Sequence, residues 1–322
     1  MKRFIFTLCT ILLSISAAYA QPGSSLRPSE TVLLYSDSFD GNVDIVYGKV
    51  TCAGFKMKEK NGLEGPERIS KWGNIANTSD LARFDLYFPE KPNGQMIVIC
   101  PGGAYVISST YNEGLYVADW MLKHGITVAV VKYRMPNGKR DVPYEDVSNT
   151  FRYCRTHAEE WGIKSIGIMG FSAGGHLAAT ASTMWTDKDT RPDFSILMYP
   201  VITMEQGYTH KDSRENLITV KAEWNRHLQE KYSMENQVTR FTPPTFIAFC
   251  SDDRSVPAEN SLRYYKKLLE CEVPAEMHIW PKGGHGWGFS KKEYIGPDGN
   301  DPFEYAREQY EALLSSWLEQ QR

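Results

Sequence analysis

Short apolar runs alternate with amphipathic segments along most of the chain from residue 81 onward. The runs have the length of buried strands, whereas the segments between them carry apolar residues at helical spacing. Strands that alternate with helices predict the α/β fold class, with a mostly parallel sheet covered by helices on both faces. The predicted strands include residues 81–88, 96–100, 126–131, 194–199, 245–250 and 275–280, and the predicted helices are residues 113–124, 142–161, 258–271 and about 302–320.

Two regions depart from this regular pattern. Residues 21–80 are rich in Gly, Asn, Ser and charge, and we expect an extended N-terminal arm that leads into edge strands. Residues 81–322 then form the main α/β domain. The stretch at about 201–241 lies between two predicted strands and is too long and polar for a simple connection. We therefore expect it to form a small cap, with a helix near residues 222–232.

The N-terminus has the composition of a secretory signal peptide at residues 1–20. Lys2 and Arg3 precede an apolar run over residues 4–15, and small residues follow. The apolar run is too short to cross a bilayer core of about 30 Å. We therefore expect cleavage before Gln21 and a periplasmic or secreted protein without stable membrane insertion.

Charge and cysteine content exclude several classes of function. The formal net charge is −3, and removing the two positive charges of the expected signal peptide takes it to −5. Because no basic block is present, we expect no nucleic-acid partner. The cysteines after residue 20 are odd in number and irregularly spaced, which argues against a disulfide framework, and no Cys or His cluster has the spacing of a zinc site. We therefore expect neither a metal nor an organic cofactor.

One stretch combines a strand, a sharp turn and a helix around a serine. An alternating run ends in Gly170-Phe171-Ser172-Ala173-Gly174, and an alanine-rich amphipathic segment follows. This setting is typical of a nucleophile elbow, in which Gly170 and Gly174 let the strand and the helix approach closely. The N–H of Ala173 would then face an oxyanion that forms beside Ser172. The alternative is a Gly/Ser-rich turn without chemistry, and the flanking strand and helix favour the elbow.

A serine nucleophile needs a base and an acid, and two predicted strand ends downstream supply both. One strand runs into Asp252 and Asp253, and the next runs into a glycine-rich loop that carries His285. An imidazole can take the serine proton, while a carboxylate holds its tautomer and stabilises its cation. Ser172, an aspartate and His285 follow the chain order expected of an α/β hydrolase. The local composition does not choose between the two aspartates.

A pair of glycines directly after a core strand is placed to supply further N–H donors for an oxyanion. It lies in the stretch Pro101-Gly102-Gly103-Ala104. Adjacent glycines let backbone N–H groups turn toward a ligand, and the second oxyanion donor of an elbow site comes from this place in the fold. We expect the N–H groups of Gly103 and Ala104 to join that of Ala173 in an oxyanion hole. The alternative is an ordinary Gly-Gly turn.

These stretches resemble the α/β-hydrolase superfamily and, within it, the secreted carbohydrate acetylesterases, including acetyl xylan esterases, of polysaccharide-degrading bacteria. The resemblance implies an α/β-hydrolase catalytic domain over residues 81–322. It also implies that Asp253 is the acid, because two residues separate it from a Val-Pro pair as in that family, and that His285 is the base. One departure is Pro101, which stands where the family usually has a histidine. The matching segments are residues 101–105, 169–177, 199–204, 210–217, 253–257 and 283–288.

The four stretches and the resemblance together indicate a serine esterase that hydrolyses O-acetyl esters of plant polysaccharide or oligosaccharide. The expected intermediate is an acyl-enzyme on Ser172, and the expected partner is an acetylated carbohydrate; the sequence does not indicate an oligomeric state. A feruloyl-type or other small-ester carboxylesterase is the alternative within the same fold. A serine peptidase and a glycoside hydrolase are less favoured, the latter because no pair of carboxylates stands out for glycosidic cleavage.

Four side chains flank the catalytic loops and are candidates for binding the substrate. Aromatic faces suit sugar rings. Packing in the core is the alternative for each of them. The four are Tyr105, Tyr111, Glu113 and Trp287.

Overall fold

The structure of the chain is a computed structural model. It describes residues 26–36, 49–60, 67–70, 74–76, 78, 81–219, 226–289 and 301–322. The segment expected to be a signal peptide, residues 1–20, lies outside the described residues. That expectation therefore stays a prediction.

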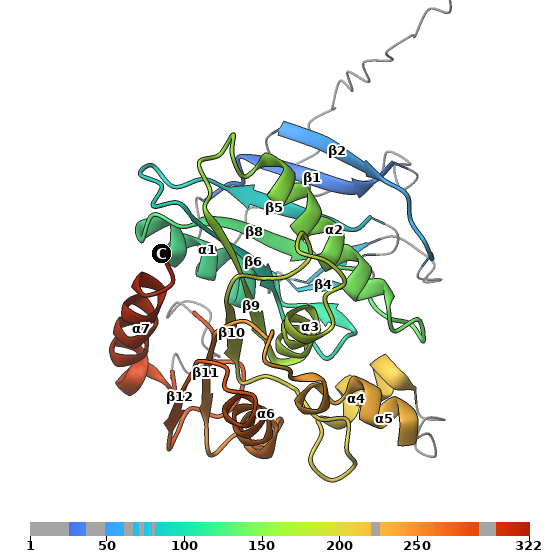
Figure 1. The fold of residues 1–322 in the computed structure, drawn as a ribbon, viewed down its shortest axis with the longest axis vertical. Helices are drawn as coiled ribbons and strands as arrows, with labels where there is room; N and C mark the ends of the chain where they lie inside the picture. Colours follow the sequence, from blue (N-terminus) through green and yellow to red (C-terminus); the bar gives the residue numbers. More distant parts are fainter. Residues whose placement is uncertain are drawn as a thin grey trace, which may run out of the picture.

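The described residues build one large sheet of mostly parallel strands (Figure 1). Its strands are β1 (Glu30–Tyr35), β2 (Lys49–Phe55), β5 (Arg83–Tyr87), β6 (Gln95–Cys100), β8 (Thr127–Lys132), β9 (Ser165–Phe171), β10 (Ser195–Met198), β11 (Thr245–Cys250) and β12 (Ala275–Trp280). They lie in the order β12-β11-β10-β9-β6-β8-β5-β1-β2. Pairing is parallel from β12 through β9 and β6 to β8, whereas β5 is antiparallel to both β8 and β1. The predicted mostly parallel sheet is confirmed.

The central strands are buried along their whole length, and apolar except at their end residues, because helices cover both of their faces. Every residue of β6, β8, β10 and β11 is buried. Such continuous apolar runs are typical of parallel strands inside an α/β sheet. The edge strand β12 is only partly covered, and most of its residues are half-exposed. The carboxyl ends of these parallel strands lie at one edge of the sheet, which is where an α/β sheet places its working residues.

Two groups of helices flank the sheet. Figure 1 shows α1 (Tyr116–Lys123) and α7 (Glu304–Glu319) on one side of the strands and α2 (Val142–His157), α3 (Ser172–Thr183) and α6 (Glu259–Glu270) on the other. A hydrogen bond of 3.1 Å from Trp120 Nε1 to Glu311 Oε2 joins α1 to α7. The helix predicted from residue 113 begins instead as the π-helical turn η2 (Tyr111–Leu115), which leads directly into α1.

The N-terminal strands continue the main sheet. β1 is entirely buried and pairs antiparallel with β5, and β2 pairs with β1 at the edge. A separate three-stranded sheet contains β3 (Arg68–Ile69), β4 (Ile75–Ala76) and β7 (Ile107–Ser108). β7 directly follows the Gly-Gly loop, so this small sheet lies beside the candidate site.

Residues 201–241 contain two short helices and a 3-10 turn in their described part. These are α4 (Lys211–Ile218), α5 (Arg226–Tyr232) and η4 (Met234–Gln237). The helix expected at residues 222–232 overlaps α5, whereas α4 was not predicted. α4 is mostly polar and only two turns long, so its hydrophobic periodicity is weak. η4 packs against both α3 and α6, which attaches this segment to the main domain.

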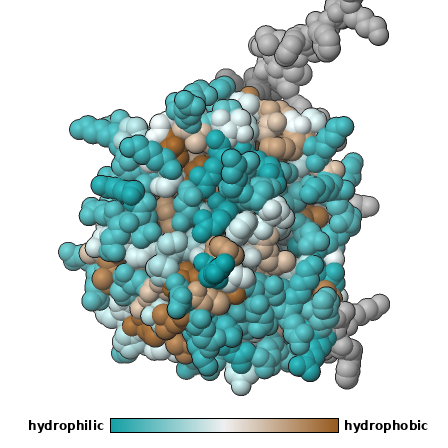
Figure 2. All heavy atoms as spheres, in the orientation of Figure 1, coloured by the Kyte–Doolittle hydropathy of each residue, from teal (hydrophilic) through white to brown (hydrophobic). Residues whose placement is uncertain are grey.

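The surface shown in Figure 2 is largely hydrophilic, with the larger apolar patch low in the view near β12 and α6. Exposed apolar side chains in that region are Leu262, Leu269 and Ile279. No helix among the described residues has the length and apolar character needed to cross a bilayer. The cysteines at positions 52, 100, 154, 250 and 271 are free thiols.

Candidate active site

Ser172 lies at the junction of β9 and α3, in a backbone conformation that few side chains adopt. Its φ is 52°, in the left-handed region, and its side chain is close to fully buried. A Cβ on Gly170 would lie 2.2 Å from the carbonyl oxygen of Gly174, and one on Gly174 would lie 2.1 Å from the carbonyl oxygen of Cys100. Only glycine fits at these two positions, so they permit the tight strand-to-helix turn that presents Ser172.

His285 contacts both Ser172 and Asp253. Its Nε2 atom lies 2.8 Å from Ser172 Oγ, and its Nδ1 atom lies 2.6 Å from Asp253 Oδ2. The histidine is on the loop after β12 and the aspartate on the loop after β11, at neighbouring strand ends. When Nδ1 carries the proton that Asp253 accepts, Nε2 is free to accept the serine proton. The arrangement can therefore generate a serine nucleophile.

The two adjacent aspartates have different partners. Asp253 is nearly buried, and its second oxygen accepts hydrogen bonds from the N–H groups of Ser255 and Val256. Asp252 instead accepts hydrogen bonds from the N–H groups of Gly283 and Gly284. The structure thus places Asp253 against the imidazole and Asp252 against the backbone of the histidine loop.

The Gly-Gly loop after β6 turns back on itself beside Ser172. Gly103 has a φ of 128°, and its carbonyl oxygen accepts hydrogen bonds from the N–H groups of Val106 and Ile107. Ala104 also has a positive φ, of 55°. Among the described residues, the N–H groups of Gly103, Ala104 and Ala173 donate no hydrogen bond to another protein group. Donors of this kind can hold an oxyanion.

A cavity of about 690 Å³ opens over Ser172 and His285. It is lined on one side by the Gly-Gly loop and on the other by α4 and the residues before it. Most of the lining side chains are polar, and the cap contributes carboxylates, an amide and an imidazole. The remaining lining residues are Asn74, Gly103, Ala104, Val106, Ile107, Ser109, Asn112, Glu113, His210, Asp212, Glu215, Asn216, Ser255 and Gly286.

The cap residues in this lining were not predicted from the sequence. His210 Nδ1 lies 2.8 Å from Ser213 Oγ and accepts a hydrogen bond from the N–H of Ser213, so it caps the N-terminus of α4. Burial lowers the pKa of His210, and the neighbouring His285 lowers it further. Asn216 donates a hydrogen bond of 2.9 Å to the carbonyl oxygen of Ala104. The cap is therefore attached directly to the Gly-Gly loop.

Three of the four side chains expected to contact the substrate lie outside the lining of the cavity over Ser172. Tyr105 is buried, with its hydroxyl 2.8 Å from His176 Nδ1. Trp287 is buried and stacks on Phe303 at 3.9 Å between ring centroids. Tyr111 lines a separate small hollow. The rings of Tyr105 and Trp287 thus pack inside the protein, and that of Tyr111 is partly buried against the core.

Glu113 does border the cavity, but its carboxylate is buried and bonded to the protein. Oε2 accepts a hydrogen bond of 2.8 Å from the N–H of Gly102, and Oε1 accepts one of 2.8 Å from the hydroxyl of Tyr199. Burial raises the pKa of Glu113, and these two hydrogen bonds together with the nearby His285 partly oppose that shift. Both carboxylate oxygens are thus occupied by groups that belong to the loops around Ser172.

His176, on the elbow helix, is a buried neutral histidine. Its Nδ1 atom lies 2.8 Å from the hydroxyl of Tyr105, and its Nε2 atom lies 2.8 Å from the carbonyl oxygen of Tyr232. Burial lowers its pKa to about 4, which the bond to Tyr232 only partly opposes. The imidazole therefore connects α3 with the Gly-Gly loop and the cap.

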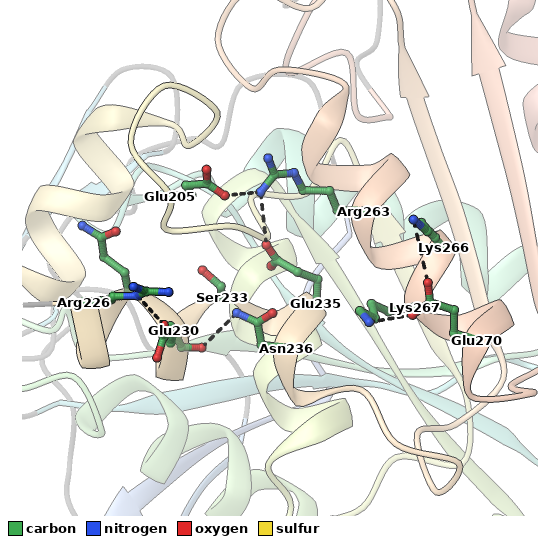
Figure 3. A pocket seen from close by; sticks show the side chains of 11 residues that line it. Glu205, Arg226, Glu230, Ser233, Glu235, Asn236, Arg263, Lys266, Lys267 and Glu270 are labelled. Atoms are coloured by element: carbon green, nitrogen blue, oxygen red, sulfur yellow. Dashed lines mark hydrogen bonds and ion pairs between the residues drawn. The ribbon is translucent and has the colours of Figure 1, made fainter.

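A second cavity, of about 590 Å³, lies between α5, η4 and α6 (Figure 3). Charged side chains that form ion pairs line this cavity. Arg263 contacts Glu205 and Glu235, and Arg226 contacts Glu230. None of the residues that line it also lines the cavity over Ser172. The two Arg263 pairs join α6 to the cap, whereas the Arg226 pair lies within α5. Among the described residues, no group of three or more His, Cys, Asp or Glu side chains is placed to hold a metal ion.

The chain is similar to known esterases and belongs to one of their families. The model of the BD-FAE family matches residues 84–268. An acetylxylan esterase of Xylanibacter ruminicola is 42% identical over 219 residues, which are 66% of this chain and 45% of that protein. The chain therefore spans less than half the length of this relative.

Two solved structures have a similar fold. An acetyl ester-xyloside bifunctional hydrolase from Caldicellulosiruptor lactoaceticus is 30% identical, with a TM-score of 0.63 over 74% of this chain and 88% of that one. A sugar hydrolase (YeeB) from Lactococcus lactis is 29% identical, with a TM-score of 0.64 over 76% of this chain and 95% of that one. Both align with most of their own length, so the similarity extends over a whole domain.

Proposed function

Because the chain belongs to the BD-FAE family, we propose that it is a carboxylic ester hydrolase that removes O-acetyl groups from plant polysaccharide or its oligosaccharides. One observation carries the proposal: the His285 imidazole bridges Ser172 and Asp253, with Nε2 2.8 Å from the serine oxygen and Nδ1 2.6 Å from the carboxylate. The similarity to an acetylxylan esterase and to an acetyl ester-xyloside hydrolase supports the choice of an acetylated carbohydrate as the substrate.

The proposed reaction begins with attack of Ser172 Oγ on the carbonyl carbon of the ester. His285 Nε2 accepts the serine proton, and Asp253 stabilises the imidazolium that forms. The carbonyl oxygen becomes an oxyanion, which accepts hydrogen bonds from the N–H groups of Gly103, Ala104 and Ala173. Collapse of this intermediate breaks the bond to the sugar oxygen, which takes the proton from His285. The acetyl group remains as an ester on Ser172.

The second half of the proposed reaction releases the acid. A water molecule in the position of the departed sugar gives a proton to His285 Nε2 and attacks the acetyl carbon. The same N–H groups stabilise the second oxyanion. Its collapse returns the proton to Ser172 Oγ and releases acetic acid, which ionises to acetate in water, so the enzyme is regenerated without any cofactor in the scheme.

The lining of the cavity supports a polar substrate. Hydroxyl, amide, imidazole and carboxylate groups surround the opening, and they can exchange hydrogen bonds with the hydroxyls of a sugar. The cavity volume of about 690 Å³ leaves room for a sugar residue beside the reacting ester. We also propose that the protein is exported, because residues 1–20 have the pattern of a signal peptide.

Release of acetate from a panel of acetylated glycans tests the substrate. We expect wild-type protein to release acetate from acetylated xylan or xylo-oligosaccharides, and the S172A variant to release none above background. Hydrolysis of feruloyl esters in preference to acetyl esters would assign the protein to the feruloyl-type alternative. Release of reducing sugar from deacetylated xylan would point to glycoside hydrolysis instead.

A further inference from the structure

A buried carboxylate connects the two loops that the proposed reaction brings together. Glu113 has an exposed fraction of only 4%, and it lies in η2, at the start of the helix that follows the Gly-Gly loop. One of its oxygens accepts the N–H of Gly102, the residue directly before Gly103. The carboxylate therefore fixes the backbone of the loop that supplies the proposed oxyanion donors.

Its other oxygen reaches the histidine loop through Tyr199, the residue after β10. The Tyr199 hydroxyl donates to Glu113 Oε1 and accepts a hydrogen bond of 3.0 Å from the N–H of Gly288. Gly288 lies three residues after His285. The Tyr199 ring also packs edge-on against the His285 imidazole, with 4.8 Å between centroids and 63° between planes. Tyr199 thus contacts both the backbone and the imidazole of that loop.

The atoms around Gly102 and the Glu113 carboxylate are closely packed. A Cβ on Gly102 would lie 2.7 Å from Glu113 Oε2 and 2.9 Å from Ser172 Cβ, so only glycine lets the loop backbone approach both the carboxylate and the serine. Burying a carboxylate is costly unless it is hydrogen-bonded, and here each oxygen accepts one bond. A carboxylate is an acceptor at both oxygens, whereas the amide of glutamine has one acceptor and one donor. Glutamine at this position can keep the bond from Gly102 only by turning its NH2 group toward Tyr199, which reverses that hydrogen bond and makes the hydroxyl accept from both glutamine and Gly288.

We propose that Glu113 is a positioning residue of the esterase reaction, which sets the distance between the oxyanion donors and His285 through Gly102, Tyr199 and Gly288. The inference rests on the proposed function. Glu113 does not exchange a proton with the substrate in this scheme. It acts before the substrate arrives, by keeping two loops from different strand ends in one geometry.

Steady-state kinetics with p-nitrophenyl acetate distinguishes positioning from a general contribution to folding. E113Q should lower kcat by roughly 10- to 100-fold and leave KM within about 3-fold, since the lost geometry matters most when the oxyanion forms. Y199F removes the hydroxyl between Glu113 and Gly288 and should lower kcat by roughly 10-fold. Because both changes break the same connection, the double variant should lose much less than the product of the two single effects.

Two matched variants control for the loss of a buried carboxylate and of a buried hydroxyl. Glu235 is a buried acid in the cavity of Figure 3, and Tyr264 is a buried tyrosine on α6 whose hydroxyl has no hydrogen-bond partner among the described residues. E235Q and Y264F should keep kcat within about 2-fold of the wild type, because neither residue borders the cavity over Ser172. The midpoint of thermal unfolding is measured for each variant, so that a loss of kcat can be distinguished from a loss of stability.

The outcomes separate this inference from the proposed function. If S172A abolishes turnover while E113Q and Y199F keep the wild-type rate, Glu113 has no positioning role. The proposal of a serine esterase is unaffected by that result. Multiplicative effects in the double variant would also overturn the role of Glu113, because they would show two independent contributions. If E113Q does not fold, Y199F compared with Y264F carries the test. Wild-type protein that neither turns over the ester nor reacts with a fluorophosphonate would overturn both proposals.

Discussion

Asp252 and Asp253 are neighbours in the chain, yet their carboxylates bind different parts of the same loop. Asp253 Oδ2 lies 2.6 Å from His285 Nδ1, whereas Asp252 Oδ1 accepts the N–H of Gly284 at 2.8 Å. The sequence around the pair offers no reason to prefer either one, because both follow the end of β11. The geometry assigns them separate tasks: one faces the imidazole, and the other holds the backbone that carries it.

This difference predicts unequal effects of two matched substitutions. D253N should lower kcat by about 1000-fold or more, because an amide N–H facing His285 Nδ1 favours the wrong imidazole tautomer. D252N should cost less than about 10-fold, since it weakens only one anchor of the loop. Both are read out as kcat with p-nitrophenyl acetate. An equal or larger loss in D252N would contradict the assignment of Asp253 as the acid.

Gly103 provides a test of the oxyanion loop. A Cβ at this position would lie 2.1 Å from the carbonyl oxygen of Ile107, and the φ of 128° disfavours any other residue. G103A should therefore displace the donors and lower kcat by roughly 100-fold or more. The measurement is kcat of the folded variant, with thermal unfolding recorded in parallel.

Gly162 supplies the control for G103A. It also has a positive φ, of 67°, but a Cβ there would meet no atom within 4 Å. G162A should destabilise the fold by about 1 kcal/mol through backbone strain and keep kcat unchanged. Comparable activity in the two variants would count against an oxyanion hole at Gly103.

His176 predicts a specific dependence of stability on pH. Its pKa in the folded protein is lowered from 6.5 to about 4, so between these values the unfolded chain binds the proton more readily. The contribution of His176 to the free energy of unfolding is therefore fully present above about pH 6.5. It is lost as the pH falls toward 4. The loss amounts to about 3 kcal/mol across that window.

A comparison of wild type with H176Q isolates this contribution, because the other titrating groups are common to both proteins. The free energy of unfolding, from urea titrations at several pH values, should fall more steeply for the wild type on acidification. Parallel curves for the two proteins would show that His176 does not titrate in this range.

The strand, the turn and the helix around Ser172 can be predicted from the sequence because that part of the site is local. The glycines that permit the turn, the strand before Ser172 and the helix after it lie within one continuous segment. Asp253 and His285 are likewise found at strand ends, where an α/β sheet collects its polar residues. The α/β-hydrolase fold expected from these patterns is confirmed by the similar solved structures.

Contacts between segments far apart in the chain could not be predicted in the same way. Trp287 stands in a glycine-rich loop and has the pattern of an exposed residue, but it stacks on Phe303 in the turn before α7. Glu113 has the pattern of a surface carboxylate on a helix, although Gly102 and Tyr199 bury and bind it. Periodicity reports which face of an element is apolar. It does not report which loop residues turn inward once several strand ends meet.

Ser172 is the nucleophile of the proposed reaction, so the rate of p-nitrophenol release from the acetate ester by S172A is the decisive measurement. S182A is the matched control, because Ser182 lies on the same helix and donates only to the carbonyl oxygen of Ala178. Folded S172A should show no turnover above the uncatalysed rate, while S182A should keep the wild-type rate. Wild-type turnover by folded S172A would show that Ser172 is not the nucleophile.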